Sequence, residues 1–372
     1  MNSAATTAVA PARVNIIGEH TDHNDGLVLP TCTALFTRVT ARARDDRCVS
    51  ATSAMFDEEK SFDLDNLQPG HSKHWTEYIK GVAAGLLDAG APLQGVDLEI
   101  SGDIPTGAGL SSSASLELAV AHALLGVCDH DVDAAELALI CQRAEHQFAG
   151  VQCGIMDQYA LACARLGSAL FLDCRTLQTR QVSLPKELGF LLTDSGLRHN
   201  LTDGNYNKRA DECVAAVKIL ADPNPVVTSL RDVDAPMLAR YRSDLGETLY
   251  RRCRHVLTEN QRVLDMVSAL EATDLPEVGA LLTACHESLR DDFETSCEPV
   301  DSLVAAANQS DAVLGSRMVG GGFGGCVLSA CHTDHIAEAA ADIRRAYNAA
   351  NGKEPWQHQV VPADPAHVLE GQ

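Results

Sequence analysis

The chain has 372 residues, 45% of them hydrophobic, and carries 51 acidic residues against 29 lysines and arginines, a formal net charge of -22. This length favours two domains with packed cores, and the acidic balance excludes nucleic acid and anionic membrane surfaces as partners. No stretch approaches the ~18 uninterrupted apolar residues of a membrane span, and the N-terminus lacks the charged and apolar regions of a secretory signal. Thirteen cysteines without CxxC pairs predict free thiols in a reducing cytoplasm.

The predicted elements change in character along the chain. In the first half, strands are predicted at 13–17, 27–29, 35–43, 96–100 and 169–172, and helices at 75–89, 113–127 and 132–149. The second half is mainly long helices, at 208–220, 246–271 and 275–290, followed by a glycine-rich turn, a strand at 326–330 and a helix at 335–349. This order predicts an α+β fold. The least helical central break, 173–187, places a domain boundary near residue 185, which gives domains of 1–185 and 186–372.

A polar loop lies between the first two predicted strands, in the segment RVNIIGEHTDHNDGLVLP (13–30). The spacing of His20 and His23 suits two metal ligands on a helix, but Gly18 and Gly26 indicate a loop instead. A calcium loop fails because its acidic residues are out of register. Two interpretations stay open. One is a plain polar turn, and the other is a sugar site, because carboxylates, imidazole and amide groups can satisfy vicinal hydroxyls.

A second motif follows a predicted strand at residues 102–118, GDIPTGAGLSSSASLEL. Its glycines allow backbone N–H groups to approach a ligand closely, and its serines begin a helix whose N-terminus favours an anion. The segment is not a Walker A motif, because Ala108 stands where that motif has lysine. The choice is between a phosphate-binding loop and a serine-capped helix after a glycine turn.

A third motif, GGGFGG at 320–325, formally matches GxGxxG. It precedes a predicted strand rather than a helix, so the dinucleotide-binding interpretation fails in context. Five glycines in six positions are costly in chain entropy. We therefore expect a tight turn that packs closely against a neighbouring element or a ligand.

Taken together, PARVNIIGEHTDHNDGLVLP, GDIPTGAGLSSSASLELA and SRMVGGGFGGCVLS resemble the three motifs of the GHMP small-molecule kinases, and the first resembles the galactokinase signature. Five further segments are similar to galactokinases, so the resemblance covers nearly the whole chain: HWTEYIKGV, CGIMDQYA, LRHNL, RRCRHVLTEN and ESLRDDFETSC. It implies a two-domain GHMP kinase fold. The N-terminal domain would be ribosomal-protein-S5-domain-2-like, the C-terminal domain ferredoxin-like, and the active site would lie in the cleft between them.

The resemblance also implies an activity, which is ATP- and Mg²⁺-dependent phosphorylation of D-galactose at the C1 hydroxyl. The products would be galactose 1-phosphate and ADP, as in the Leloir pathway, and the enzyme would be a monomer or weak dimer. N-acetylgalactosamine kinases are a near alternative, but those relatives tend to have IDYC where this chain has TDHN. A catalytically silent galactose sensor is a second alternative. The intact start of the phosphate-loop helix and the presence of Arg13 and Asp157 disfavour it.

Residue roles follow from the resemblance position by position. Asp157 would be the catalytic base, with Arg13 as its partner. The sugar contacts would be Glu19, His20, Asp22, Gly154, Asp157 and Tyr206. ATP would meet Trp75 at the adenine and, along the phosphate loop, Gly107, Ala108, Gly109, Leu110, Ser111, Ser112, Ser113 and Ala114. Mg²⁺ would be held by Ser113 and Glu145. His23 stands where the family usually has tyrosine.

Overall fold

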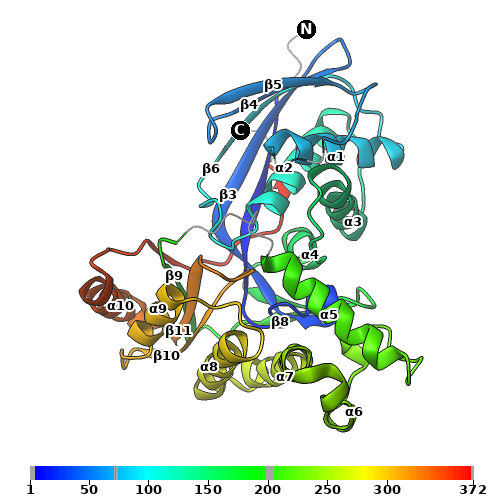
Figure 1. The fold of residues 1–372 in the computed structure, drawn as a ribbon. Helices are drawn as coiled ribbons and strands as arrows, with labels where there is room; N and C mark the ends of the chain where they lie inside the picture. Colours follow the sequence, from blue (N-terminus) through cyan, green and yellow to red (C-terminus); the bar gives the residue numbers. More distant parts are fainter. Residues whose placement is uncertain (1–4, 71, 73, 198–204, 370–372) are drawn as a thin grey trace.

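The computed structural model describes residues 5–70, 72, 74–197 and 205–369, and Figure 1 shows two bodies joined by long strands. The upper body is a six-stranded sheet with helices on one side. In sheet order the strands are β13 (His367–Val368), β1 (Thr6–Asn15), β3 (Pro30–Ala43), β6 (Val96–Gly102), β4 (Cys48–Ser53) and β5 (Glu58–Asp63). The helices are α1 (Trp75–Asp88), α2 (Ser112–Val127), α3 (Ala134–Ala144) and α4 (Met156–Cys163).

The lower body is a four-stranded antiparallel sheet with helices around it (Figure 1). Its strands, in sheet order, are β10 (Val313–Met318), β11 (Cys326–His332), β9 (Leu188–Asp194) and β12 (Gln357–Gln359). Its helices are α5 (Asn205–Ala221), α6 (Ala235–Arg240), α7 (Arg242–Ala272), α8 (Leu275–Asp291), α9 (Glu298–Ala307) and α10 (Ile336–Asn351). A third, small sheet joins β2 (Leu27–Val28), β7 (Ser168–Asp173) and β8 (Thr179–Ser183).

Two apolar cores hold these bodies, and β1 contributes to both. Ala8 and Ala10 pack in the core beneath α1 and α2, whereas Ala12 and Val14 pack in the core of the lower body. All four side chains are fully buried. Because Arg13 lies on this same strand, the strand that crosses between the cores also carries a predicted site residue into their junction.

The long amphipathic elements lie where the sequence predicts them, with small shifts. The helix predicted at 132–149 is α3 followed by a π-helical turn, Glu145–Ala149, and the strand predicted at 13–17 is β1, which ends at Asn15. The sequence missed α4, α6, α9 and the strands β4, β5, β8, β9, β10, β12 and β13. These elements are short, so the period of their apolar residues is hard to recognise.

The predicted boundary near residue 185 falls between β8 and β9, which belong to different sheets. The C-terminal strand β13 nevertheless returns to the first sheet and pairs with β1 through Ala8 and Val9. We keep the division into 1–185 and 186–372 as a proposal. Residues 198–201 of the LRHNL segment lie outside the described residues.

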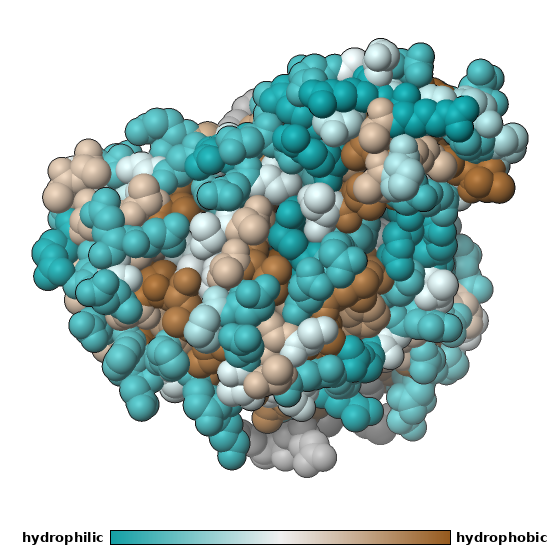
Figure 2. Space-filling model, turned by 90° about the horizontal axis from the view of Figure 1, so that it is seen from below, coloured by the Kyte–Doolittle hydropathy of each residue, from teal (hydrophilic) through white to brown (hydrophobic). Residues whose placement is uncertain are grey.

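One face of the molecule is largely hydrophilic. Figure 2 shows hydrophilic residues over most of the face seen from below, with hydrophobic residues visible in between. Among the described residues, no helix is both long enough and apolar enough to cross a membrane.

Candidate functional site

The three glycine-containing motifs meet at one pocket between the two bodies. The polar loop, the phosphate-loop segment and the turn at 320–321 all line it, as do the start of α4 and the start of α5. The predicted site residues that line it are Arg13, Glu19, His20, Asp22, Gly107, Gly109, Leu110, Ser111, Ser112, Ser113, Glu145, Gly154, Asp157 and Tyr206. Ala108 and Ala114 are buried behind the loop. Trp75 lines a neighbouring pocket that shares Ser112 and Ser113 with the first.

The polar loop is fixed by its own hydrogen bonds. The Thr21 hydroxyl donates to the carbonyl oxygens of Gly18 (2.9 Å) and Leu27 (2.7 Å), and the Asn24 amide donates to the carbonyl of His20 (2.9 Å). Only one 3₁₀ turn, Asp22–Asn24, forms inside it. Among the described residues, no group of three or more His, Cys, Asp or Glu is arranged to hold a metal ion.

Aromatic rings surround the imidazole of His20. Its ring centroid lies 4.7 Å from that of Phe293 and 5.5 Å from that of Tyr206. Burial, together with the nearby imidazoles of His23 and His255, keeps the pKa of His20 well below its usual value. A neutral imidazole can donate one hydrogen bond and accept another, and Nε2 of His20 has no partner in the described structure. It is therefore free to bind a hydroxyl group.

His23, the departure from the usual tyrosine, pairs with Asp22 at the edge of the pocket. Its Nδ1 lies 3.3 Å from Oδ1 of Asp22, and both side chains are about one-tenth exposed. Burial opposes its charge, but Asp22 and Cys213 raise the pKa of His23 to about 10. Gly154 leaves room for the carboxylate, since a Cβ there would lie 1.9 Å from Oδ2 of Asp22. This part of the pocket consequently holds Asp22 as an ionised hydrogen-bond acceptor.

Arg13 and Asp157 form an ion pair between the polar loop and the phosphate loop. The Nε and Nη2 atoms of Arg13 each lie 2.7 Å from Oδ1 of Asp157. The Ser111 hydroxyl donates to Oδ2 over 2.5 Å, and Arg13 Nη1 donates to the carbonyl oxygen of Gly109. Burial opposes the charge of Arg13, but Asp157 and the nearby carboxylates raise its pKa. Asp157 also lies in the first turn of α4, where the helix dipole favours a carboxylate.

Two further carboxylates, of Glu117 and Glu145, are buried beside the phosphate loop, and no lysine or arginine among the described residues forms an ion pair with them. Gln158 Nε2 donates to Glu117 Oε2 (3.1 Å) and to Glu145 Oε2 (3.0 Å). Oε1 of Glu117 has no partner among the described residues. Burial and the Asp157 charge raise the pKa of Glu145 to about 7, although hydrogen bonds from Cys153, Ser113 and Gln158 act in the opposite direction. The charge of these two carboxylates is therefore not balanced by a positively charged side chain in the described structure.

The phosphate-loop segment forms a turn that leads into α2. Gly107 and Gly109 have φ angles of +68° and +78°, which side chains other than glycine rarely adopt. Its neighbour in space is the turn at 320–325, because a Cβ on Gly320 would lie 2.9 Å from the Cα of Gly109. This close approach explains why both segments are rich in glycine. The N-terminus of α2 and its serines face the pocket.

The second pocket has an aromatic wall. The ring of Trp75 stacks on Phe56 with centroids 6.2 Å apart and an interplanar angle of 10°. Its indole N–H donates to Glu58 Oε2 over 2.8 Å. The pocket leads from this wall to Ser112 and Ser113, so an elongated ligand could reach from the aromatic wall to the Arg13–Asp157 pair.

Sequence reasoning missed the residues that support the polar loop from below. Arg317, Glu259, His255 and Phe293 come from the C-terminal half and contact the loop directly. Their segments, SRMV, RRCRHVLTEN and ESLRDDFETSC, are similar to galactokinases, but the sequence alone did not assign them a role. No signal in the spacing of their own segments marks them, because they are buried through contacts with the distant polar loop.

Comparisons with known proteins agree with this geometry. Residues 1–43 match the family model of the galactokinase galactose-binding signature, 77–165 the GHMP kinases N terminal domain, and 266–349 the GHMP kinases C terminal model. Galactokinases of Chloroflexus aurantiacus and Roseiflexus are 44% and 42% identical, each over at least 92% of this chain and 88% of theirs.

Solved structures give the same result. Lactococcus lactis galactokinase complexed with galactose superimposes with a TM-score of 0.94 and 33% identity, over 99% of this chain and 96% of that one. Mevalonate kinase of Methanococcus jannaschii shares the fold alone, with a TM-score of 0.70 and 17% identity over 97% of this chain and 99% of that one. The two-domain architecture is therefore that of the GHMP kinases, and the chain belongs to the galactokinase family.

Proposed function

We propose that this protein transfers the γ-phosphoryl group of ATP to the C1 hydroxyl of D-galactose, giving galactose 1-phosphate and ADP. The observation that carries the proposal is the position of the Arg13–Asp157 pair, between the hydroxyl-binding loop and the phosphate loop. Phosphoryl transfer depends mostly on positioning and on charge stabilisation. A pair at this junction can reach the acceptor hydroxyl and the transferred group at the same time.

In this proposal, Asp157 receives the hydrogen bond of the C1 hydroxyl and accepts its proton. Oδ1 of Asp157 is occupied by Arg13 and Oδ2 by Ser111, so the carboxylate has a fixed orientation before the sugar binds. Arg13 offsets negative charge on the carboxylate and on the transferred phosphoryl oxygens. The remaining hydroxyls would be bound by His20, Asp22 and Tyr206, with the backbone at Gly154 and the carboxylate of Glu19 completing the pocket.

Ser113 and Glu145 would hold Mg²⁺. The raised pKa of Glu145 and the unpartnered oxygen of Glu117 indicate negative charge that lacks a cation. Mg²⁺ commonly binds one or two protein oxygens together with substrate phosphates, which fits so small a donor set. When bound, the ion would offset the charge of the ATP phosphates. The adenine would lie against Trp75, and the phosphates along 107–114.

We also propose a reducing cytoplasm as the location, because all thirteen cysteines are free thiols. The enzyme should act as a monomer or weak dimer. Size-exclusion chromatography with light scattering would measure the mass of the particle in solution, which can be compared with the 39.6 kDa of one chain.

The function is tested by incubating the protein with ATP, Mg²⁺ and a panel of sugars while ADP release is measured. We expect D-galactose to be the preferred acceptor and the product to be phosphorylated at C1. Preference for N-acetylgalactosamine or arabinose would contradict the assignment. Galactose binding without any turnover would instead indicate a galactose sensor.

A further inference from the structure

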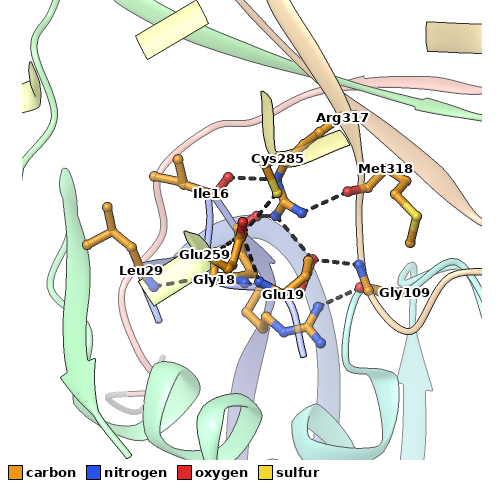
Figure 3. Close-up of polar contacts among 12 residues, drawn as sticks. Ile16, Gly18, Glu19, Leu29, Gly109, Glu259, Cys285, Arg317 and Met318 are labelled. Atoms are coloured by element: carbon orange, nitrogen blue, oxygen red, sulfur yellow. Dashed lines mark hydrogen bonds and ion pairs between the residues drawn. The ribbon is translucent and has the colours of Figure 1, made fainter. Parts of the chain in front are cut away.

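Strand β10 carries an arginine whose side chain is buried between the two halves of the chain. Arg317 has no exposed surface. Its Nε donates to the carbonyl oxygen of Ile16 (2.7 Å), Nη1 donates to that of Met318 (2.8 Å), and Nη2 donates to the carbonyl of Asn15 and to Oε1 of Glu19 (3.0 Å). Figure 3 shows the contacts of Arg317 with Ile16, Glu19 and Met318. One side chain thus holds the end of β1, the polar loop and its own strand.

Glu19 is bonded at every polar atom, mostly to the C-terminal half. Its backbone N–H donates to Glu259 Oε1 (3.3 Å), and its carbonyl accepts from His255 Nε2 (3.0 Å). Its carboxylate accepts three hydrogen bonds, from Arg317 (3.0 Å), the backbone N–H of Gly320 (2.8 Å) and the Asn15 amide (3.0 Å). The orientation of Glu19 is therefore determined by the C-terminal half before any ligand arrives.

Glu259, on α7, holds the backbone of the same loop from the other side (Figure 3). Its Oε1 accepts from the N–H of Gly18 (2.9 Å) and from the Cys285 thiol (2.9 Å), and its Oε2 accepts from Arg262 (2.6 Å). Burial alone would raise the pKa of Glu259, but Arg262 and the other nearby groups lower it to about 2. The carboxylate is consequently ionised throughout the physiological range.

Stability alone is a weak explanation for this network. Removing charges from water costs several kcal/mol per ion, and apolar side chains of similar volume are often as stabilising as a buried ion pair. What an apolar cluster cannot do is fix the direction of a backbone N–H, a carbonyl and a carboxylate at once. Arg317 and Glu259 fix all three, and they do so in the loop that precedes His20 and Asp22.

We propose that Arg317 and Glu259 are positioning residues for the acceptor sugar: they set the backbone of residues 15–19 and the carboxylate of Glu19 from the C-terminal half. The proposal rests on the galactokinase function proposed above. Because the two residues contact the loop and not the pocket wall at Trp75, they act on the sugar side of the reaction. Their loss should misplace the hydroxyl-binding groups while leaving nucleotide binding in place.

The test uses the full chain and compares Michaelis constants. Arg317→Lys keeps the charge but cannot span four acceptors, so we expect KM for galactose to rise at least tenfold and KM for ATP to stay within twofold. Arg317→Met should raise the galactose KM further. Glu259→Ala should also raise it at least tenfold, whereas Glu259→Gln, whose side-chain oxygen can still accept from Gly18, should recover most of the loss.

Ile343→Ala is the matched control, since Ile343 is fully buried on α10, and none of the residues that line the pocket lies on that helix. It should lower Tm without changing either KM, which is also what a merely structural role predicts for Arg317. An independent readout is the shift in Tm on adding galactose alone, which should shrink in the Arg317 and Glu259→Ala variants and persist in the control.

A galactose KM within twofold of wild type in folded Arg317→Lys or Glu259→Ala would overturn the proposal. If the Arg317 variants do not fold, the two Glu259 variants decide by the same criterion. Absence of galactose turnover by the wild-type protein would refute the proposed function instead, and the galactose-induced shift in Tm would still test the positioning role.

Discussion

The two ends of the pocket balance buried negative charge in opposite ways. At the sugar end, every buried carboxylate has a cationic partner: Glu19 has Arg317, Glu259 has Arg262, and Asp22 has His23. At the phosphate end, Glu117 and Glu145 share one neutral amide, and no lysine or arginine in the described part of the chain forms an ion pair with either.

This difference shows at which end of the pocket the protein alone compensates the buried carboxylates, without a bound ligand. A carboxylate in low dielectric is stable only when it is paired, hydrogen-bonded or protonated. The sugar end meets that condition through the protein alone, so its geometry is preformed. At the phosphate end, no cation in the described structure pairs with Glu117 or Glu145. We propose that a divalent cation arriving with ATP supplies the missing positive charge. Asp157 lies where the two ends meet and belongs to the paired kind.

The largest expected effect is at this junction. Asp157→Asn keeps the shape of the side chain but removes the proton acceptor, so kcat should fall by about 10²–10⁴, while the circular dichroism spectrum stays unchanged. Asp173→Asn is a suitable control, because Asp173 is also paired with an arginine, Arg231, but lines neither of the two pockets. Near-normal turnover by Asp157→Asn would show that Asp157 is not needed for the reaction. The contrast between the two ends of the pocket would then say nothing about catalysis.

The next effect concerns the stability of the sugar end. Glu259 has a pKa of about 2 in the folded protein against an ordinary value of 4.5. A lowered pKa stabilises the fold above pH 4.5, and this stabilisation is lost as the pH falls from 4.5 towards 2. The full difference is about 3 kcal/mol, of which about 1 kcal/mol is lost by pH 4.

Urea unfolding of wild type and Glu259→Gln at pH 7 and pH 4 measures this change. The free-energy gap between the two proteins should narrow by about 1 kcal/mol on acidification. A gap that stays constant would show that the charge of Glu259 is not specifically stabilised by its surroundings. The buried carboxylate at the sugar end would then be no better compensated by the protein than those at the phosphate end.

The same contrast explains how far the sequence could predict the site. Pocket residues that lie on short motifs, such as Asp22 and Ser113, come from segments whose glycines and polar side chains already indicate a ligand, and the structure brings them together. Supporting residues such as Glu259, on α7, and Arg317, on the short strand β10, are charged, and charged residues normally face solvent. Their burial depends on contacts between distant segments, which spacing along one segment does not encode.

The fold shows the same division. Long amphipathic elements such as α8 and α10 are predictable because their apolar residues recur over several turns. Strand β9 was missed because it is short and buried along its whole length, so it has no alternation to recognise. The π-helical turn Glu145–Ala149 follows directly on α3 and ends at Gly150, which has a positive φ angle. No local pattern in the sequence predicts such a turn.

A third prediction addresses the phosphate end through its metal requirement. Glu145→Gln removes one negative charge next to Ser113, so the Mg²⁺ concentration that gives half-maximal activity should rise about tenfold or more. Glu99→Gln is the control, because Glu99 is an exposed residue on β6. Activity titrated with Mg²⁺ at a fixed ATP concentration measures the effect. If the half-maximal Mg²⁺ concentration is unchanged, the carboxylate of Glu145 does not contribute to Mg²⁺ binding.

The smallest effect is on stability, and its sign distinguishes the two ends. Burial and the neighbouring Glu145 raise the pKa of Glu117 well above its usual value. Such a carboxyl group opposes folding increasingly as the pH rises above 4.5, because the unfolded chain releases the proton more easily. In protein kept free of divalent ions with EDTA, Glu117→Gln should therefore raise the free energy of unfolding by about 1 kcal/mol at pH 8.

Glu259→Gln, measured under the same conditions, should lower the free energy of unfolding, because its carboxylate is stabilised by Arg262 and not opposed by a neighbour. If Glu117→Gln raises the free energy of unfolding and Glu259→Gln lowers it, the buried charge is compensated by the protein at the sugar end. At the phosphate end it would need a bound cation. Equal losses in both variants would mean that the hydrogen bonds from Gln158, Ser113 and Cys153 are enough to compensate Glu117 and Glu145. Binding of a divalent cation would then have to be favoured by the nucleotide phosphates without help from buried protein charge.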